Sequence, residues 1–153
     1  MEKNPLSHQR IIPKSRGTYI LVLELPSAAR IRVGSLGIID FDSGTYLYVG
    51  SAHGPGGLHA RIMRHLRRRK RLFWHIDYFL RYAKILAVYI IKSPKKLECR
   101  IAQQLIAEGV PFVTGFGSSD CRCKSHLFRV ADPQIIDEIL RKLCLNYSLI
   151  DIR

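Results

Sequence analysis

The chain has 153 residues, of which 47% are hydrophobic and 24% are charged. This composition is typical of one globular domain and excludes wholesale disorder. The 25 Lys and Arg residues outnumber the 12 Asp and Glu residues, which gives a formal net charge of +13. Such an excess favours a polyanionic partner, with nucleic acid ahead of an anionic membrane surface.

The first third of the chain predicts a basic arm followed by strands. Residues 1–16 are polar, carry two prolines and show no period, so we expect an N-terminal arm outside the core. Residues 18–25 alternate between two faces, as a strand does. Two short β-like runs within residues 26–43 predict an inserted hairpin, and residues 45–50 predict the next strand.

The remainder of the chain predicts helices around one further strand. Residues 58–71 and 74–82 have the spacing of amphipathic helices. Residues 85–91 are apolar on both faces, which predicts a strand inside the sheet. A helix is expected from Pro94 to Gly109, and a last helix is expected after Pro133.

A dense run of cations lies in and after the first predicted helix. It consists of Arg61, Arg64, Arg67, Arg68, Arg69, Lys70 and Arg71. The segment contains no acid that could neutralise these residues at helical spacing. We interpret it as a phosphate-binding face, since clustered cations gain affinity by releasing counterions from a polyanion. The alternative is a solvated helix end, where cations suit the helix dipole.

Three residues on the predicted helices have side chains suited to phosphate chemistry. Arg61 and His65 lie one turn apart, so they could contact the same phosphate; the alternative is an exposed Arg beside a partly packed His. Glu98 falls on the inward face of its helix, where a carboxylate needs a cation. Two interpretations of Glu98 stay open, a salt bridge to an arginine and a ligand for a divalent metal.

These residues, together with two short triplets, resemble the GIY-YIG nuclease superfamily. The triplets are Gly17-Thr18-Tyr19 and Tyr48-Val49-Gly50, and Arg61, His65 and Glu98 follow in the family's order. The resemblance covers residues 17–109 and points to a GIY-YIG-like branch. It implies an α/β (α+β) fold in one domain over residues 17–153, with a three-stranded antiparallel core sheet flanked by helices. The inserted hairpin replaces a short turn of typical members.

The same resemblance implies a metal-dependent DNA endonuclease that hydrolyses phosphodiester bonds, in repair or recombination. Glu98 would bind one divalent ion, Mg²⁺ or Mn²⁺, and Arg61 would hold the scissile phosphate. Tyr19 and Tyr48 would orient or deprotonate the attacking water, with nearby arginines lowering their pKa. His65 would assist proton transfer.

A second class of function stays open, a nucleic-acid-binding module that keeps the fold without cleavage. In its favour, residues 110–116 lack an asparagine that the family often places downstream of the glutamate. The sequence does not decide between DNA and RNA. His75 and Asp77 form a further polar pair, which we expect on a helix surface.

The cysteines pose the question of a metal. Cys121, Cys123 and His126 form a C-x-C-x-x-H pattern, but a structural zinc site needs four ligands. Cys99 and Cys144 lie in helical patterns that indicate packing. We therefore expect no zinc and interpret the stretch as a loop and strand lining the site.

The location of the protein follows from what the sequence lacks. The longest purely apolar stretch, residues 85–91, is far shorter than the roughly 20 residues that cross a bilayer. Residues 1–5 have no apolar core of a signal peptide. We expect a cytoplasmic protein with reduced cysteines and no membrane partner.

Overall fold

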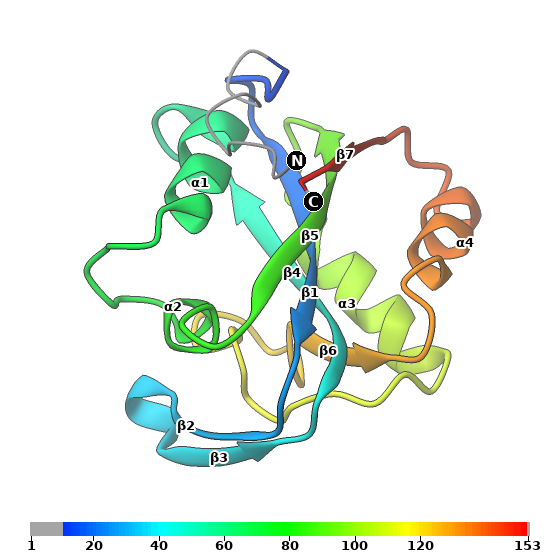
Figure 1. The fold of residues 1–153 in the computed structure, drawn as a ribbon. Helices are drawn as coiled ribbons and strands as arrows, with labels where there is room; N and C mark the ends of the chain where they lie inside the picture. The colour runs from blue at the N-terminus through cyan, green and yellow to red at the C-terminus, as the bar shows by residue number, and fades with distance from the viewer. Residues whose placement is uncertain (1–10, 153) are drawn as a thin grey trace.

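The computed structural model describes residues 11–152. They form an α+β fold, with a five-stranded antiparallel sheet, a separate two-stranded sheet and four α-helices (Figure 1). The predicted class is confirmed. The expected three-stranded core sheet is too small, because two short strands extend it, giving the order β6-β4-β1-β5-β7.

The three inner strands are β1 (Gly17–Leu25), β4 (Gly44–Ala52) and β5 (Lys84–Lys92). Strand β1 pairs antiparallel with both of the others and is therefore the centre of the sheet. The added strands are β6 (Leu127–Val130) on β4 and β7 (Ser148–Asp151) on β5. Each has four residues, which is too short for an alternating pattern to stand out in the sequence.

The inserted hairpin is confirmed. Strands β2 (Ala29–Arg32) and β3 (Ile38–Phe41) pair antiparallel, and the short 3₁₀ helix η2 (Gly34–Leu36) joins them. Ile31 and Phe41 are buried and attach the hairpin to the main core. The Phe41 ring meets the Phe79 ring edge-on, with 5.0 Å between centroids.

Helix α1 (Gly57–Leu66) ends five residues before the predicted end at residue 71. Arg67 adopts an extended backbone, and the Lys70 ammonium donates to the carbonyls of Arg64 and His65. These bonds satisfy carbonyls that the end of the helix leaves without partners. Residues 67–71 are consequently a loop.

Two of the other three helices are also shorter than predicted. Helix α2 (His75–Phe79) covers the first part of its predicted range, and α4 (Ile135–Lys142) follows Pro133 as expected and buries Ile136, Ile139 and Leu140. Helix α3 (Glu98–Ala107) begins four residues after Pro94. The Ser93 hydroxyl accepts a hydrogen bond from the backbone N–H of Lys95, which forms a turn before the helix.

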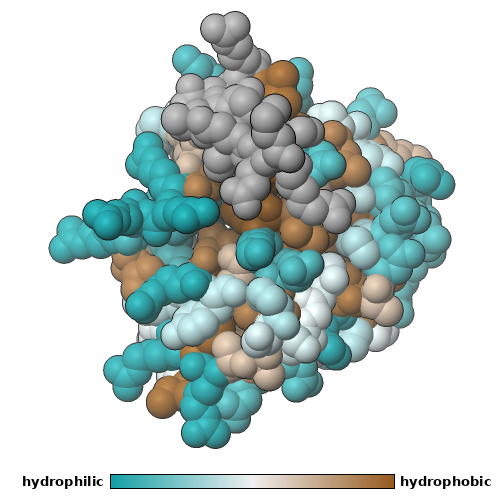
Figure 2. Space-filling view, in the orientation of Figure 1, coloured by the Kyte–Doolittle hydropathy of each residue, from teal (hydrophilic) through white to brown (hydrophobic). Residues whose placement is uncertain are grey.

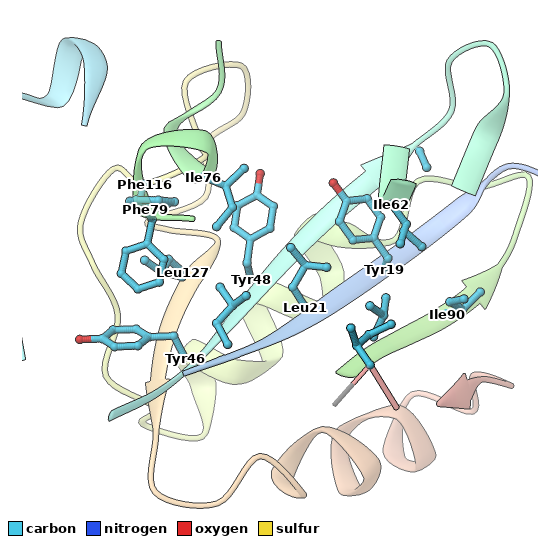
Figure 3. Packing of buried hydrophobic residues seen from close by; sticks show 14 of the residues in the cluster. Tyr19, Leu21, Tyr46, Tyr48, Ile62, Ile76, Phe79, Ile90, Phe116 and Leu127 are labelled. Carbon is cyan, nitrogen blue, oxygen red and sulfur yellow. The ribbon is translucent and has the colours of Figure 1, made fainter. Parts of the chain in front are cut away.

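The sheet separates two cores. One face carries the side chains of Tyr19, Leu21 and Tyr48, which pack against α1, α2 and the hairpin (Figure 3). The other face carries Ile20 and Val49, which pack against α3 and α4. We call these the tyrosine face and the α3 face.

Part of the predicted N-terminal arm belongs to the core. Ile12 is buried, and the carbonyls of Pro13 and Ser15 accept the N–H groups of His59 and Leu58. These are donors of the first turn of α1, which has no side-chain cap. Residues 11–16 therefore cap the helix, and the rest of the predicted arm, residues 1–10, lies outside the described residues.

Candidate functional site

The two triplets meet on the tyrosine face of the sheet. Register pairs Tyr19 of β1 with Gly50 of β4, and the Tyr19 ring lies over the glycine. A Cβ on Gly50 would come 2.3 Å from the ring carbon Cζ, so a larger residue would displace the ring. Tyr48 projects from the neighbouring strand on the same side (Figure 3).

Helix α1 brings His65 to these tyrosines. The Tyr19 hydroxyl lies 2.6 Å from His65 Nε2, and both side chains are buried. The His65 ring also meets the Tyr48 ring edge-on, with centroids 6.3 Å apart. The two tyrosines and the histidine predicted from the sequence therefore share one buried polar cluster.

Arg61 completes this cluster from the same helix. Its guanidinium carbon lies 4.2 Å from the centre of the Trp74 ring, a cation–π distance. Its charge lies close enough to Tyr19 and Tyr48 to act on the pKa of both in the downward direction. We call Tyr19, Tyr48, Arg61 and His65 the tyrosine cluster.

Burial controls the protonation of the tyrosine cluster. Burial raises the pKa of Tyr48 and of Tyr19 well above the usual value, and the opposing effect of Arg61 is smaller. The expectation that arginines would lower these pKa values overall is therefore wrong. Burial also lowers the pKa of His65 to about 3, with the positive charge of Lys70 adding to the effect. At neutral pH the phenols are protonated and the imidazole is uncharged.

His65 has an unused polar atom. Its Nδ1 is buried and has no hydrogen-bond partner within residues 11–152. When the Tyr19 hydroxyl donates to Nε2, the neutral imidazole carries its own proton on Nδ1, which is then a donor without an acceptor. A buried donor of this kind is costly, and a bound oxyanion is one group that would satisfy it.

Glu98 comes from a different helix than Arg61 and His65. It is the first residue of α3, which packs on the α3 face of the sheet. Burial lowers the pKa of His126 and raises the pKa of Cys123. The negative charge of the Glu98 carboxylate raises the pKa of both groups, so Glu98 lies near these two residues. Its Oε2 atom is buried without a hydrogen-bond partner, and no salt bridge involves it in the described part of the chain. Residues 11–152 therefore provide no salt-bridge partner for Glu98.

The loop of residues 117–126 lies beside both the tyrosine cluster and His126. A Cβ on Gly117 would lie 3.1 Å from the Tyr48 ring and 3.2 Å from His126 Cβ. Burial is the main cause of the raised pKa of Tyr48, and the nearby Asp77, Asp120 and Cys121 raise this pKa further. This loop thus contacts the tyrosine cluster on one side and His126 on the other.

The basic segment divides into bound and free cations. Arg64 makes two hydrogen bonds to the Asp77 carboxylate, at 2.8 and 2.9 Å, and its guanidinium carbon lies 4.3 Å from the centre of the Trp74 ring. Lys70 caps α1 as described above. Arg64 and Lys70, both predicted to bind nucleic acid, therefore also make contacts within the protein. The exposed members of the segment are Arg67, Arg68, Arg69 and Arg71.

Asp77 is the internal acid that the sequence did not reveal. It is fully buried, and its carboxylate also accepts the backbone N–H groups of Phe73 and Trp74. Burial alone would raise the pKa of Asp77, but the bonds from Arg64 and from the two N–H groups outweigh burial and lower it. The expected helix-surface pair is wrong for Asp77, and half-buried His75 accepts a bond from the N–H of Gly117.

A basic cavity of about 850 Å³ opens beside this segment. Its charged lining consists of Arg67, Arg68, Arg69, Lys70, Arg81 and Lys84, with Asp77 as the acid. Asp77 is already bound to Arg64, so the cavity carries a large net positive charge. Hydrophilic side chains project on this side of the molecule (Figure 2). Arg81 and Lys84 were not predicted, because they lie beyond α2 in the sequence and the fold brings them to the cationic run.

Four metal-ligating side chains meet at the loop of residues 117–126. The ligand atoms of Cys99, Cys121, Cys123 and His126 all lie within 4.8 Å of one another, so this group could hold a metal ion. The expectation that Cys99 only packs is wrong, because α3 brings it to the other three. Cys144 is exposed rather than packed. We call the four residues the Cys-His cluster.

The fold and the site define a small α+β domain with a buried tyrosine cluster, a basic cavity and a potential metal site. The chain belongs to the family described as domain of unknown function DUF123, whose model matches residues 18–148. No curated protein and no solved structure matches the chain. None of the helices within residues 11–152 has the length and apolar character needed to cross a membrane.

Proposed function

We propose that the protein is a metal-dependent endonuclease of the GIY-YIG type, which hydrolyses phosphodiester bonds in DNA. The observation that carries this proposal is the tyrosine cluster. Two buried phenols, a neutral imidazole and a guanidinium converge where the two triplets pair. A hydrophobic core has no need of these groups, and burying them is costly without a polar ligand.

Arg61 is suited to hold the scissile phosphate. Trp74 fixes the guanidinium, and no salt bridge within the described residues neutralises it. Its fixed charge can stabilise the negative charge that develops on the phosphate oxygens in the transition state. The exposed Arg67, Arg68 and Arg69 can follow the DNA backbone away from the cleavage point.

Tyr19 and His65 are suited to move a proton. A water attacks phosphorus as the bond from phosphorus to the leaving oxygen breaks. The water gives its proton to the Tyr19 oxygen, while the Tyr19 proton passes to His65 Nε2 across the 2.6 Å contact. In the free protein this transfer is unfavourable, because the pKa of His65 is lowered to about 3. A bound phosphodiester brings a negative charge that raises this pKa, so the pair accepts a proton best when substrate is present.

Glu98 fits a hard divalent cation. Its buried Oε2 atom lacks a partner, and carboxylate oxygens are the preferred ligands of Mg²⁺ and Mn²⁺. Glu98 would hold the ion, which would supply positive charge to the reacting phosphate when bound. Because Glu98 is the residue proposed to hold the ion, its substitution is the decisive experiment.

Wild-type protein is incubated with branched, nicked and single-stranded DNA and with RNA, in Mg²⁺, in Mn²⁺ and in a chelator. Glu98→Gln keeps the shape of the side chain and removes its charge, so cleavage should fall by orders of magnitude while DNA binding persists. Glu138→Gln, at an exposed position of α4, removes the same charge and should leave cleavage unchanged. Arg61→Ala should weaken both cleavage and binding.

A non-catalytic nucleic-acid-binding module is the second candidate. The observation in its favour is the basic cavity with the exposed Arg67, Arg68 and Arg69, which can bind a polyanion without cleaving it. Absence of metal-dependent cleavage for every DNA and RNA form tested, with salt-sensitive binding retained, would replace the nuclease with this function.

A further inference from the structure

We propose that the Cys-His cluster binds one Zn²⁺ ion in a closed, structural site that joins the loop of residues 117–126 to the start of α3. The ligands are the thiolates of Cys99, Cys121 and Cys123 and the imidazole Nε2 of His126. This proposal does not depend on nuclease activity. It concerns a different ion and different residues from those proposed for cleavage.

The geometry of the cluster fits a tetrahedral zinc site. With Zn–S distances near 2.3 Å and a Zn–N distance near 2.0 Å, the ligand atoms of such a site lie roughly 3.5–3.8 Å apart. The observed distances to His126 Nε2 are 3.3 Å from Cys121 Sγ and 4.0 Å from Cys99 Sγ. All ligand atoms lie within 4.8 Å of one another. Small side-chain adjustments would bring the four atoms around one ion.

The far side of the His126 ring is already arranged as in a metal site. Nδ1 lies 3.1 Å from the carbonyl oxygen of Val49, which has no proton, so Nδ1 is the donor. This bond leaves Nε2 unprotonated and directs its lone pair to the sulfur atoms. Metal-bound histidines usually donate their second N–H to a carbonyl or a carboxylate in this way.

The backbone holds His126 in place as well. Its N–H donates to the carbonyl of Phe116, and its carbonyl accepts the N–H of Val49 on β4. His126 is 3% exposed, whereas the three cysteines are half-buried. The rigid ligand is thus the histidine, and the loop cysteines close over it.

Three thiolates and an imidazole select zinc among the common divalent ions. Mg²⁺ and Ca²⁺ take oxygen ligands, while sulfur and nitrogen in a tetrahedron suit Zn²⁺. With four protein ligands no coordination position stays open for water or substrate, which is the pattern of a structural site. The ion would fix Cys99, the neighbour of Glu98, to the loop that contacts Tyr48.

The test uses the full chain, purified under reducing conditions, with zinc measured by elemental analysis. We expect about one zinc ion per chain. Replacement by Co²⁺ should give the intense visible bands of a tetrahedral site and a thiolate-to-cobalt charge-transfer band in the near ultraviolet. Bound zinc should also protect three of the four cysteines from alkylation, as counted by mass spectrometry.

Substitutions locate the site. Cys121→Ser and Cys99→Ser should each lower zinc affinity by at least about 100-fold, because even an outer partner of a metal ligand is worth 10–100-fold. Cys144→Ser is the matched control, since Cys144 is exposed and lies outside the cluster. It should bind zinc as the wild type does, and wild-type Cys144 should be the residue that alkylates. Cys121 lies on the loop, so its variant leaves the sheet and helices intact.

Four results would overturn the proposal. The first is wild-type protein without zinc that gives no charge-transfer band with Co²⁺. The second is equal loss of binding in Cys144→Ser and Cys121→Ser. The third is a disulfide between two cluster cysteines in the reduced preparation. The fourth is rapid alkylation of all four cysteines in zinc-loaded protein. None of these measurements uses DNA, so failure of the zinc proposal can be distinguished from failure of the nuclease proposal.

Discussion

The basic segment contains two populations of cations that the sequence does not distinguish. Arg61 and Arg64 each lie against the Trp74 ring, and Arg64 is bound to a buried carboxylate. A few residues later Arg67, Arg68 and Arg69 extend into solvent at the basic cavity. The first population contributes to the fold around the tyrosine cluster, where Arg61 is also proposed to hold the scissile phosphate. The second population lies exposed and is available to the rest of a polyanion. Charge density alone therefore overestimates the binding surface.

The largest effect on stability is expected from Asp77, the buried acid that binds Arg64 of the first population. Asp77→Ala leaves Arg64 without its partner and removes the acceptor of two backbone N–H groups. We expect a decrease of about 3 kcal/mol in the free energy of unfolding, measured by urea denaturation. Asp40→Ala is the control, because its pair with Arg30 is more than 70% exposed at both ends; it should leave the free energy of unfolding nearly unchanged. Equal losses of stability in Asp77→Ala and Asp40→Ala would contradict the view that the buried pair stabilises the fold more than an exposed one.

The next effect concerns pH and His65. The pKa of His65 is about 3 in the folded protein against an ordinary value of 6.5, so the unfolded chain binds a proton first as pH falls. The stability that neutral His65 contributes is full above pH 6.5 and declines progressively below it. Between pH 7 and pH 5 the decrease should be about 2 kcal/mol. His65→Gln should flatten this part of the curve relative to wild type, and an unchanged slope would contradict the burial argument.

A smaller effect is expected from the ring that both arginines contact. Trp74→Leu keeps an apolar side chain and removes both cation–π interactions, which should lower stability by about 1–2 kcal/mol in the same denaturation assay. Phe73→Leu is the matched control, since Phe73 is 74% exposed. A similar decrease in both variants would mean that the arginines do not depend on the ring.

The second population should hardly affect stability. Replacing Arg67, Arg68 and Arg69 by Ala should change the free energy of unfolding by less than about 0.5 kcal/mol. The salt dependence of DNA binding should flatten by about one unit for each phosphate that the variant no longer neutralises. A triple replacement of Arg30, Arg32 and Arg141, which lie outside the cavity lining, removes the same charge. If this control flattens the slope equally, the DNA does not lie at the cavity.

Sequence reasoning succeeded where a pattern is local. The alternation in β1, the turn between β2 and β3, and the apolar run of β5 each depend on residues close together in the chain. The four-residue spacing of Arg61 and His65 also predicted that both would reach the same region. These features follow from the periods of strands and helices.

It failed where the relevant partner is remote in the sequence. Asp77 reaches back 13 positions to Arg64, and Cys99 joins three ligands that lie beyond the end of α3. The sign of the tyrosine pKa shifts was wrong because burial depends on packing, which composition does not give. In each case the physics was known, but the neighbours were not.

The strand order carries a consequence for how the protein is made. Synthesis runs from the N-terminus, so β1, β4 and β5 are complete by residue 92, before either of their outer neighbours exists. The four-residue strands that cover both sides come from residues 127–151. Until then the nascent chain presents two open sheet edges, which are templates for pairing with other chains. Aggregation during synthesis is therefore a greater hazard for this domain than for one whose outer strands are translated first.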